Sequence, residues 1–121
     1  DFLWNIQCGV ILQLAEQGPC VIVGRNADYI LKDREDVLHT FIHANKEFRA
    51  DRIVRLYGES EKSPEARLNE KDKRRKVNYQ HYTGRNWGTA RNYDICLDSG
   101  TIGVEACADI IVGLVNASKE K

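Results

Sequence analysis

Hydrophobic positions near the start of the chain predict a helix followed by a buried strand. Apolar residues repeat at helical spacing through residues 2–14, and Gly18 with Pro19 predicts the end of that helix. Residues 20–23 (CVIV) form an uninterrupted apolar run, which is typical of a strand buried on both faces of a parallel sheet. Residues 24–28 then leave this predicted strand as a loop.

The rest of the chain alternates between strand and helix patterns. β-Branched and aromatic residues predict a strand at 37–43, and Asn45 is a good cap for the helix that follows it. Ser63 and Pro64 are residue types that open helices, so we expect a long charged helix from about 63 to 82. The remaining expected elements are a strand at 93–97, a turn at 98–101 and a helix from 103 to about 116.

This order predicts an α/β fold with a parallel sheet flanked by helices. In such sheets ligands bind where loops leave the carboxyl ends of the strands. The loops that would meet at this edge are residues 24–28, 43–46 and 98–101. The length of 121 residues predicts a single domain over 1–121.

Composition narrows the classes of function. The 18 basic and 18 acidic residues cancel, so bulk charge gives no reason to expect nucleic acid or an anionic membrane as a partner. No apolar run approaches the roughly 20 residues of a membrane span, and no signal peptide is visible. The four cysteines lie far apart within apolar runs, which favours buried free thiols in a reducing compartment. We therefore expect a cytoplasmic protein.

The Gly24-Arg25-Asn26 sequence is the first candidate site, because it directly follows the predicted strand at 20–23. Glycine allows the backbone to turn sharply and a ligand to come close. An arginine at the carboxyl end of a strand can hold a phosphate through two parallel hydrogen bonds. Position alone leaves a second interpretation open, in which Arg25 is a surface residue of a loop.

Two further clusters are basic. The first is the run 71–76 (KDKRRK), with Arg67 one helical turn before it. The second is a ladder at every third position, formed by Arg49, Arg52 and Arg55. Clusters of one sign favour an anionic ligand, but both can also be solvated helix faces that nearby Asp and Glu residues balance.

Residues 79–88 mix aromatic side chains with arginine and glycine, and they favour either stacking on a base or fixing a loop onto the domain. The three histidines have no metal-ligand spacing, so we expect no metal ligand in this chain. A GxxxxGK[ST] phosphate-binding loop does not occur in residues 1–121.

Taken together, these segments resemble the cytidylate kinase-like family of P-loop kinases. The matching stretches, in the order of the family, are CVIVGRNADYIL, VLHTFIHANKEFRADRIVRLYG, NEKDKRRKVNYQHYTGRNWG and YDICLDSGTIGVEACADII. The resemblance implies a fold of the P-loop nucleoside triphosphate hydrolase type. It also implies that the N-terminal part of this fold, with the first strand and the phosphate loop, lies upstream of Asp1. Residues 1–121 would then be a fragment that is inactive alone.

The resemblance implies an acceptor site around the first candidate loop. In this family an arginine at the position of Arg25 binds the phosphate of the acceptor nucleotide, and an Asp follows it. This sequence has Asn26 in place of that Asp, so the resemblance leaves the identity of the acceptor open. The acceptor-binding residues that it implies are Arg25, Asn26 and Asp28.

The resemblance also implies residues around the phosphoryl donor. Residues 63–88 correspond to a lid-like helical segment that closes over the phosphates, and its catalytic residues would be Asp72, Arg74 and Arg75. The ATP-binding residues would be Arg52, Ser99, Gly100 and Thr101. ATP and Mg²⁺ are the implied cofactors, with most of their ligands outside this chain.

The expected function is therefore phosphoryl transfer from ATP to a nucleoside monophosphate, with nucleotides as the partners. A non-catalytic nucleotide- or phosphate-binding relative with a regulatory role is the alternative, because Asn26 replaces the Asp of the family. A third interpretation is a basic-helix module that binds RNA or an acidic protein through residues 67–76. The zero net charge disfavours this third interpretation.

Overall fold

A computed structural model describes residues 1–119 of the chain and has a small parallel sheet flanked by helices. Its elements in chain order are α1 (Phe2–Gln17), α2 (Ala27–Ile30), β1 (Thr40–His43), α3 (Lys46–Tyr57), α4 (Pro64–Thr83), the 3₁₀ helix η1 (Ala90–Asn92), β2 (Ile95–Asp98), α5 (Ser99–Ile102) and α6 (Val104–Lys119). The predicted α/β class is confirmed by the alternation of these elements.

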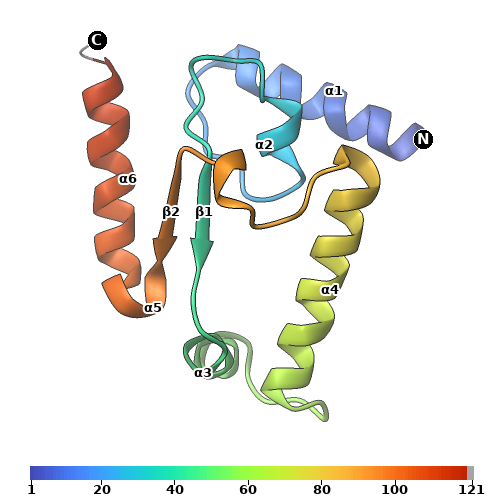
Figure 1. The fold of residues 1–121 in the computed structure, drawn as a ribbon, viewed down its shortest axis with the longest axis vertical. Coiled ribbons are helices and arrows are strands. Elements are labelled where there is room, and N and C mark those ends of the chain that lie inside the picture. Colours follow the sequence, from blue (N-terminus) through green and yellow to red (C-terminus); the bar gives the residue numbers. More distant parts are fainter. Residues whose placement is uncertain (120–121) are drawn as a thin grey trace.

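The sheet consists of β1 and β2, which run parallel with Thr40 opposite Ile95 and His43 opposite Asp98. The crossover between them contains α3, α4 and η1. In Figure 1, α3 lies beyond the carboxyl end of β1, α6 lies beside β2, and α4 runs from the α3 end of the molecule back toward α1. The carboxyl ends of both strands therefore face the α3 end of the molecule.

Local sequence sets the boundaries of the two crossover helices. The Asn45 side chain accepts a hydrogen bond from the Phe48 amide at 2.8 Å, and the Ser63 hydroxyl accepts one from the Ala66 amide at 3.2 Å. Each cap satisfies an amide that the first helical turn leaves without a backbone partner. Gly84 ends α4 in the left-handed region, with φ of 72°. The predictions for these two helices are confirmed.

The prediction of a buried strand at 20–23 is wrong. These residues pair with no strand within the part of the chain that the structure describes, and Val21 and Val23 are 92% and 85% exposed. Only Ile22 packs inward, against the cluster between α1 and α2. A run that is apolar at every position needs neighbouring strands on both sides and layers on both faces to be buried, and the described residues do not supply them.

Three smaller corrections concern the ends of elements. β1 begins at Thr40, three residues later than predicted, and β2 extends through Asp98. The predicted turn at 98–101 is the start of the short helix α5. The expectation of buried thiols holds for Cys107, whereas Cys20 is exposed; all four cysteines are free.

The core is divided into two clusters of buried side chains. The first packs α1 against α2 and is formed by Ile11, Ala27 and Leu31. The second packs α3 against α4 and is formed by Ala50, Ile53 and Leu68. Between them, Phe41 of β1 contacts the rings of Trp87 and Tyr93, with centroids 5.5 Å and 4.9 Å away. These aromatic contacts fix the segment after α4 onto the sheet. Packing a loop onto the domain is one of the two roles that the sequence left open for residues 79–88.

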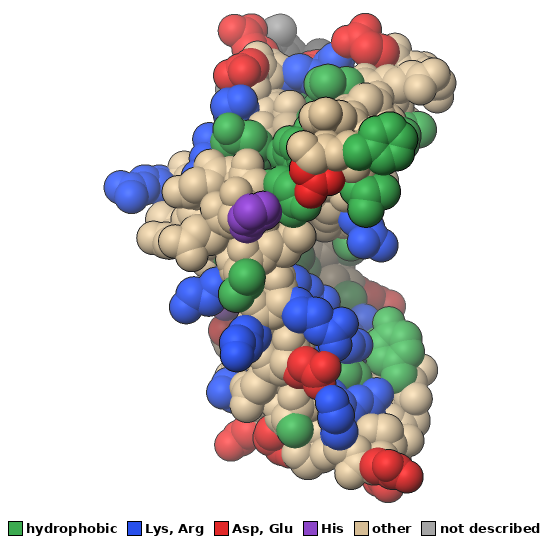
Figure 2. Space-filling view, turned by 90° about the vertical axis from the view of Figure 1, so that its right-hand side faces the viewer, with side chains coloured by type: hydrophobic (Ala, Val, Ile, Leu, Met, Phe, Trp, Pro, Cys, Tyr) green, Lys and Arg blue, Asp and Glu red, His purple; other side chains and the backbone are tan. Residues whose placement is uncertain are grey.

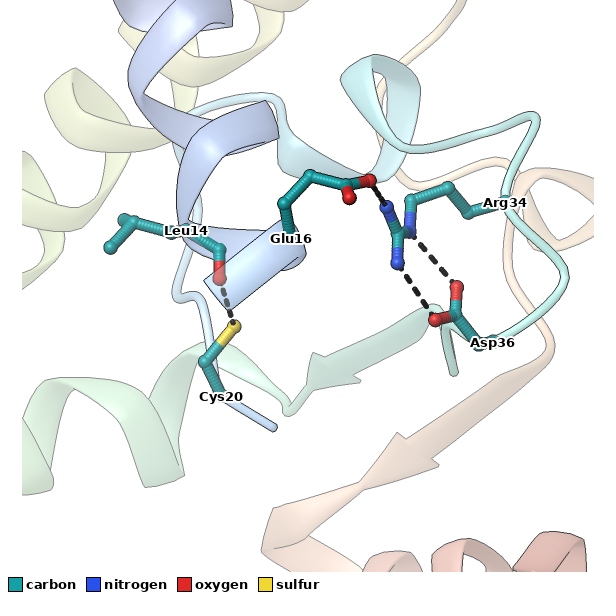
Figure 3. A network of polar contacts seen from close by, with 5 residues as sticks. All are labelled: Leu14, Glu16, Cys20, Arg34 and Asp36. Carbon is teal, nitrogen blue, oxygen red and sulfur yellow. Dashed lines mark hydrogen bonds and ion pairs between the residues drawn. The ribbon is translucent and has the colours of Figure 1, made fainter. Parts of the chain in front are cut away.

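An ion-pair network ties the end of α1 to the loop before β1 (Figure 3). Arg34 donates two hydrogen bonds to Asp36, at 2.9 Å and 2.8 Å, and a third to Glu16 of α1. The pairing with Arg34 lowers the pKa of Asp36. In the same view the Cys20 thiol lies 3.9 Å from the Leu14 carbonyl oxygen, which it approaches as a weak donor.

Helices α1 and α6 expose many apolar side chains, among them Phe2 at 77% and Leu3 at 74% in α1 and Val112 at 57% in α6. None of the helices among residues 1–119 combines the length and the apolar composition needed to cross a membrane.

Replacing Gly88 by Ala is expected to destabilise the fold. Gly88 has φ of 82°, and a Cβ built on it lies 3.3 Å from the Phe41 ring. We expect a loss of about 1–2 kcal/mol in the free energy of unfolding, since alanine is disfavoured in the left-handed region. Urea denaturation followed by circular dichroism measures this loss.

The control is Gly113→Ala in α6, where nothing lies within 4 Å of the added Cβ. This substitution should stabilise the protein by up to about 1 kcal/mol through helix propensity. Equal effects of the two substitutions would contradict the proposed role of Gly88.

Candidate functional site

Three consecutive residues after the 20–23 segment adopt left-handed backbone conformations. Gly24, Arg25 and Asn26 have φ of 69°, 59° and 57°, and the latter two are the residues other than glycine with positive φ among residues 1–119. For an arginine this conformation costs on the order of 1–2 kcal/mol. The Gln7 side chain stabilises it by donating a hydrogen bond to the Arg25 carbonyl oxygen at 2.8 Å. Strain of this kind is concentrated at functional sites.

This left-handed turn (residues 24–26) is bound to the C-terminal half of α4. The Asn26 side-chain amide donates a hydrogen bond to Asn78 Oδ1 at 3.1 Å. One residue further along α4, the Tyr79 hydroxyl donates to Asp28 Oδ2 at 2.7 Å. Tyr79 is only 2% exposed, and burial together with the Asp28 carboxylate raises the pKa of its hydroxyl. The structure thus brings the predicted acceptor loop into contact with the predicted lid-like segment.

Asp72 joins α4 to α3 through a two-hydrogen-bond ion pair. Arg49 donates to its two oxygens at 2.8 Å and 2.6 Å, and both side chains are 26% exposed. The Arg49 guanidinium lowers the pKa of Asp72, and Arg75, 3.4 Å away, adds to this effect. Sequence spacing placed Arg49 among the ladder arginines but did not indicate Asp72 as its partner, because the two residues are 23 positions apart.

The other predicted arginines do not converge on one point in this conformation. Arg74 points outward on α4, where it is 73% exposed and pairs with Glu70 at 2.7 Å. Lys62 pairs with the same carboxylate, and the two cations lower the pKa of Glu70, Lys62 more strongly. Arg52 is half-buried on α3 and forms no ion pair with any residue in the described range 1–119.

Three of the predicted ATP-binding residues, Ser99, Gly100 and Thr101, form the first turn of α5 at the carboxyl end of β2. Asp98 Oδ1 accepts hydrogen bonds from the Gly100 and Thr101 amides, at 3.0 Å and 3.2 Å, and Oδ2 accepts one from the Thr101 hydroxyl. These bonds lower the pKa of Asp98. The Ser99 side chain is buried and donates to the His43 carbonyl oxygen at 3.4 Å. Hydrogen bonds within the protein therefore hold this turn, and they engage both of its hydroxyls.

The helices α3 and α4 with their connection, the α3–α4 hairpin, form a basic region in a chain of zero net charge. Residues 46–76 contain eleven Lys and Arg against seven Asp and Glu. Figure 2 shows Lys and Arg side chains gathered over the lower part of the molecule, where α3 and the first turns of α4 lie. A cationic region of this kind attracts phosphates although the bulk charge is neutral.

Two carboxylates of the predicted site are engaged by other groups of the protein. Asp72 binds Arg49, and Asp98 caps α5. Within residues 1–119 no three His, Cys, Asp or Glu side chains come together as metal ligands.

A known protein family matches the part of the sequence that contains the candidate site. The sequence pattern of the cytidylate kinase-like family matches residues 1–101. The chain belongs to the cytidylate kinase-like family. The match includes the left-handed turn, the α3–α4 hairpin and the turn at Asp98, and it ends before α6.

A solved structure supports the fold of this family member. The chain is similar to the crystal structure of an uncharacterized protein from Eubacterium ventriosum, with a TM-score of 0.86 and 32% sequence identity. The similarity covers 93% of this chain and 71% of that one. Among curated proteins, no sequence matches this chain.

Replacing Asp72 by Asn is expected to loosen the α3–α4 hairpin. At pH 7 we expect a loss on the order of 1–2 kcal/mol in the free energy of unfolding, between the values for exposed and buried ion pairs. The folded state lowers the pKa of Asp72, so its stabilising effect is present above the unfolded pKa of about 3.9 and disappears as the pH falls through the folded pKa. Urea denaturation from pH 7 to pH 3 measures both effects.

Asp51→Asn is the matched control, since Asp51 pairs with Arg55 on an exposed face of α3 with 68% and 61% exposure. Its effect should stay below about 0.5 kcal/mol at every pH. If the difference between wild type and Asp72→Asn did not shrink in acid, the ion pair would not be the source of the stability.

Proposed function

We propose that the protein transfers a phosphoryl group from ATP to a nucleoside monophosphate. The observation that carries the proposal is the left-handed turn, which holds Arg25 in a strained conformation and is bonded through Asn26 to Asn78 of the basic helix α4. Membership of the cytidylate kinase-like family supports a kinase-like, nucleotide-binding protein. The identities of the phosphoryl acceptor and of the phosphoryl donor belong to the proposal and do not follow from the family match.

In this mechanism Arg25 holds the phosphate of the acceptor through two charge-assisted hydrogen bonds. The transferring phosphoryl group spreads negative charge over its oxygens, and cations stabilise that charge. Arg52, Arg74 and Arg75 of the α3–α4 hairpin are the proposed cations. Arg74 can leave Glu70 at little cost, because an exposed ion pair contributes only about 0–1 kcal/mol.

The donor side of the proposal is ATP with Mg²⁺ in a fold of the P-loop type. Residues 1–121 contain no GxxxxGK[ST] loop, so the donor phosphates would be held by a loop outside these residues. The parallel pairing of β1 with β2 supports this fold. The exposed Val21 and Val23 support it as well, because an apolar segment of this kind is suited to lie beside another strand.

A phosphoryl-transfer screen of the whole protein with ATP, Mg²⁺ and a panel of nucleoside monophosphates tests the proposal. Arg25→Gln should raise the KM for the acceptor by at least about tenfold and change the KM for ATP little, because it removes a charged hydrogen-bond donor to the phosphate. Arg55→Gln is the matched control, since Arg55 lies on an exposed face of α3. Transfer to none of the nucleotides would refute the kinase proposal.

A nucleotide-binding relative without catalysis is the second candidate. Asn26 in place of the family's Asp favours it, as does the engagement of Asp72 by Arg49. This protein would bind nucleoside monophosphates through Arg25 and turn none of them over. Isothermal titration with the same panel separates the two candidates, because binding that Arg25→Gln abolishes, without turnover in the wild type, indicates the regulatory relative.

A further inference from the structure

A polar groove shares only Asp28 with the predicted transfer site. It has a volume of about 240 Å³ and is lined by Asp28, Lys32, His39, Arg85, Arg91 and Asp94, among other residues. His39 directly precedes β1 and Asp94 directly precedes β2, so the groove lies at the amino ends of the strands. The turn at Asp98 lies at their carboxyl ends, and neither Arg25 nor any α4 arginine lines the groove.

Three cations of this groove are available for an anion. The ring of Tyr29 holds two of them, with Lys32 Nζ at 4.4 Å and Arg85 Cζ at 5.1 Å from its centroid. Lys32 has one ion pair, 3.5 Å from Asp33, whose side chain is 90% exposed. Within residues 1–119, Arg85 and Arg91 form no ion pair. The repulsion between Lys32 and Arg85 at one ring would be relieved by a bound anion.

The two carboxylates of the groove each keep one oxygen free for a ligand. Asp28 Oδ2 accepts a hydrogen bond from the Tyr79 hydroxyl, and Asp94 Oδ2 accepts one from the His39 amide, both at 2.7 Å. In both residues Oδ1 has no hydrogen-bond donor within the described part of the chain. A carboxylate oxygen that is held in place and free on one side is a suitable acceptor for sugar hydroxyls.

We propose that this groove binds a small phosphorylated sugar. Arg85, Arg91 and Lys32 would hold the phosphate, and Asp28 and Asp94 would accept hydrogen bonds from the hydroxyls. The carboxylates disfavour a bare anion, and an unphosphorylated sugar leaves the three cations without a partner. The volume lies below the range of about 300–1,000 Å³ typical of pockets for drug-sized ligands, which favours a small ligand over a nucleoside triphosphate. The groove shares Asp28 with the predicted acceptor site of the proposed kinase, but its three cations are not among the residues assigned to that site.

Isothermal titration of the whole protein with ribose 5-phosphate tests the proposal, in the absence of ATP and of any acceptor. Ribose 5-phosphate should bind at least about tenfold more tightly than either inorganic phosphate or ribose. Arg91→Gln should weaken this binding by about tenfold or more, and Lys32→Gln should weaken it as well, because each substitution removes a phosphate donor. Both residues are exposed, so the variants should keep the circular dichroism spectrum of the wild type.

Lys73→Gln is the matched control, since Lys73 is an exposed cation of α4 outside the groove, and it should bind as the wild type does. The proposal is overturned if the wild type does not bind ribose 5-phosphate, or if binding survives both Arg91→Gln and Lys32→Gln. It is also overturned if inorganic phosphate binds equally well. Displacement by a nucleoside monophosphate together with weakening by Arg25→Gln would assign the ligand to the acceptor site instead.

Discussion

The hydrogen bond from Tyr79 to Asp28 joins parts of the molecule that otherwise have separate cores. One cluster of buried side chains lies between α1 and α2, and the other lies between α3 and α4. Tyr79 belongs to the second pair of helices but reaches Asp28 of the first, and it is nearly inaccessible to solvent. A buried hydroxyl without this partner would carry the full penalty of lost hydration. The position of the left-handed turn relative to α4 therefore depends on this contact.

The helices α3 and α4 were predictable because the causes of their boundaries are local. Asn45 and Ser63 cap helices through contacts with amides three residues away, so the sequence contains the whole signal. The 20–23 segment shows the opposite case. Its apolar pattern indicates a strand that needs partners on both sides, and burial of such a segment depends on what lies next to it in space.

For the candidate site, residues could be proposed from the sequence, but the contacts between them could not be predicted. Arg25 was proposed from its position after residues 20–23, and Asp72 was proposed from the resemblance to the family. Their contacts, and the roles of Asn78, Tyr79 and Arg49 as partners, were not predicted. These contacts join residues more than 20 positions apart, and no spacing rule links such positions. Tyr79 did leave one signal, since it is an aromatic residue in the largely polar second half of α4, as Tyr82 is.

The left-handed turn also limits which residues position 25 can hold. Its left-handed backbone conformation favours glycine, and an arginine at this position adopts a conformation that residues other than glycine disfavour. Selection for stability alone would drive this position toward glycine, and selection for anion binding would drive it back to arginine. Under the proposed function, stability and activity would therefore oppose each other at position 25, and the identity of this residue in related chains would report which of the two was under selection.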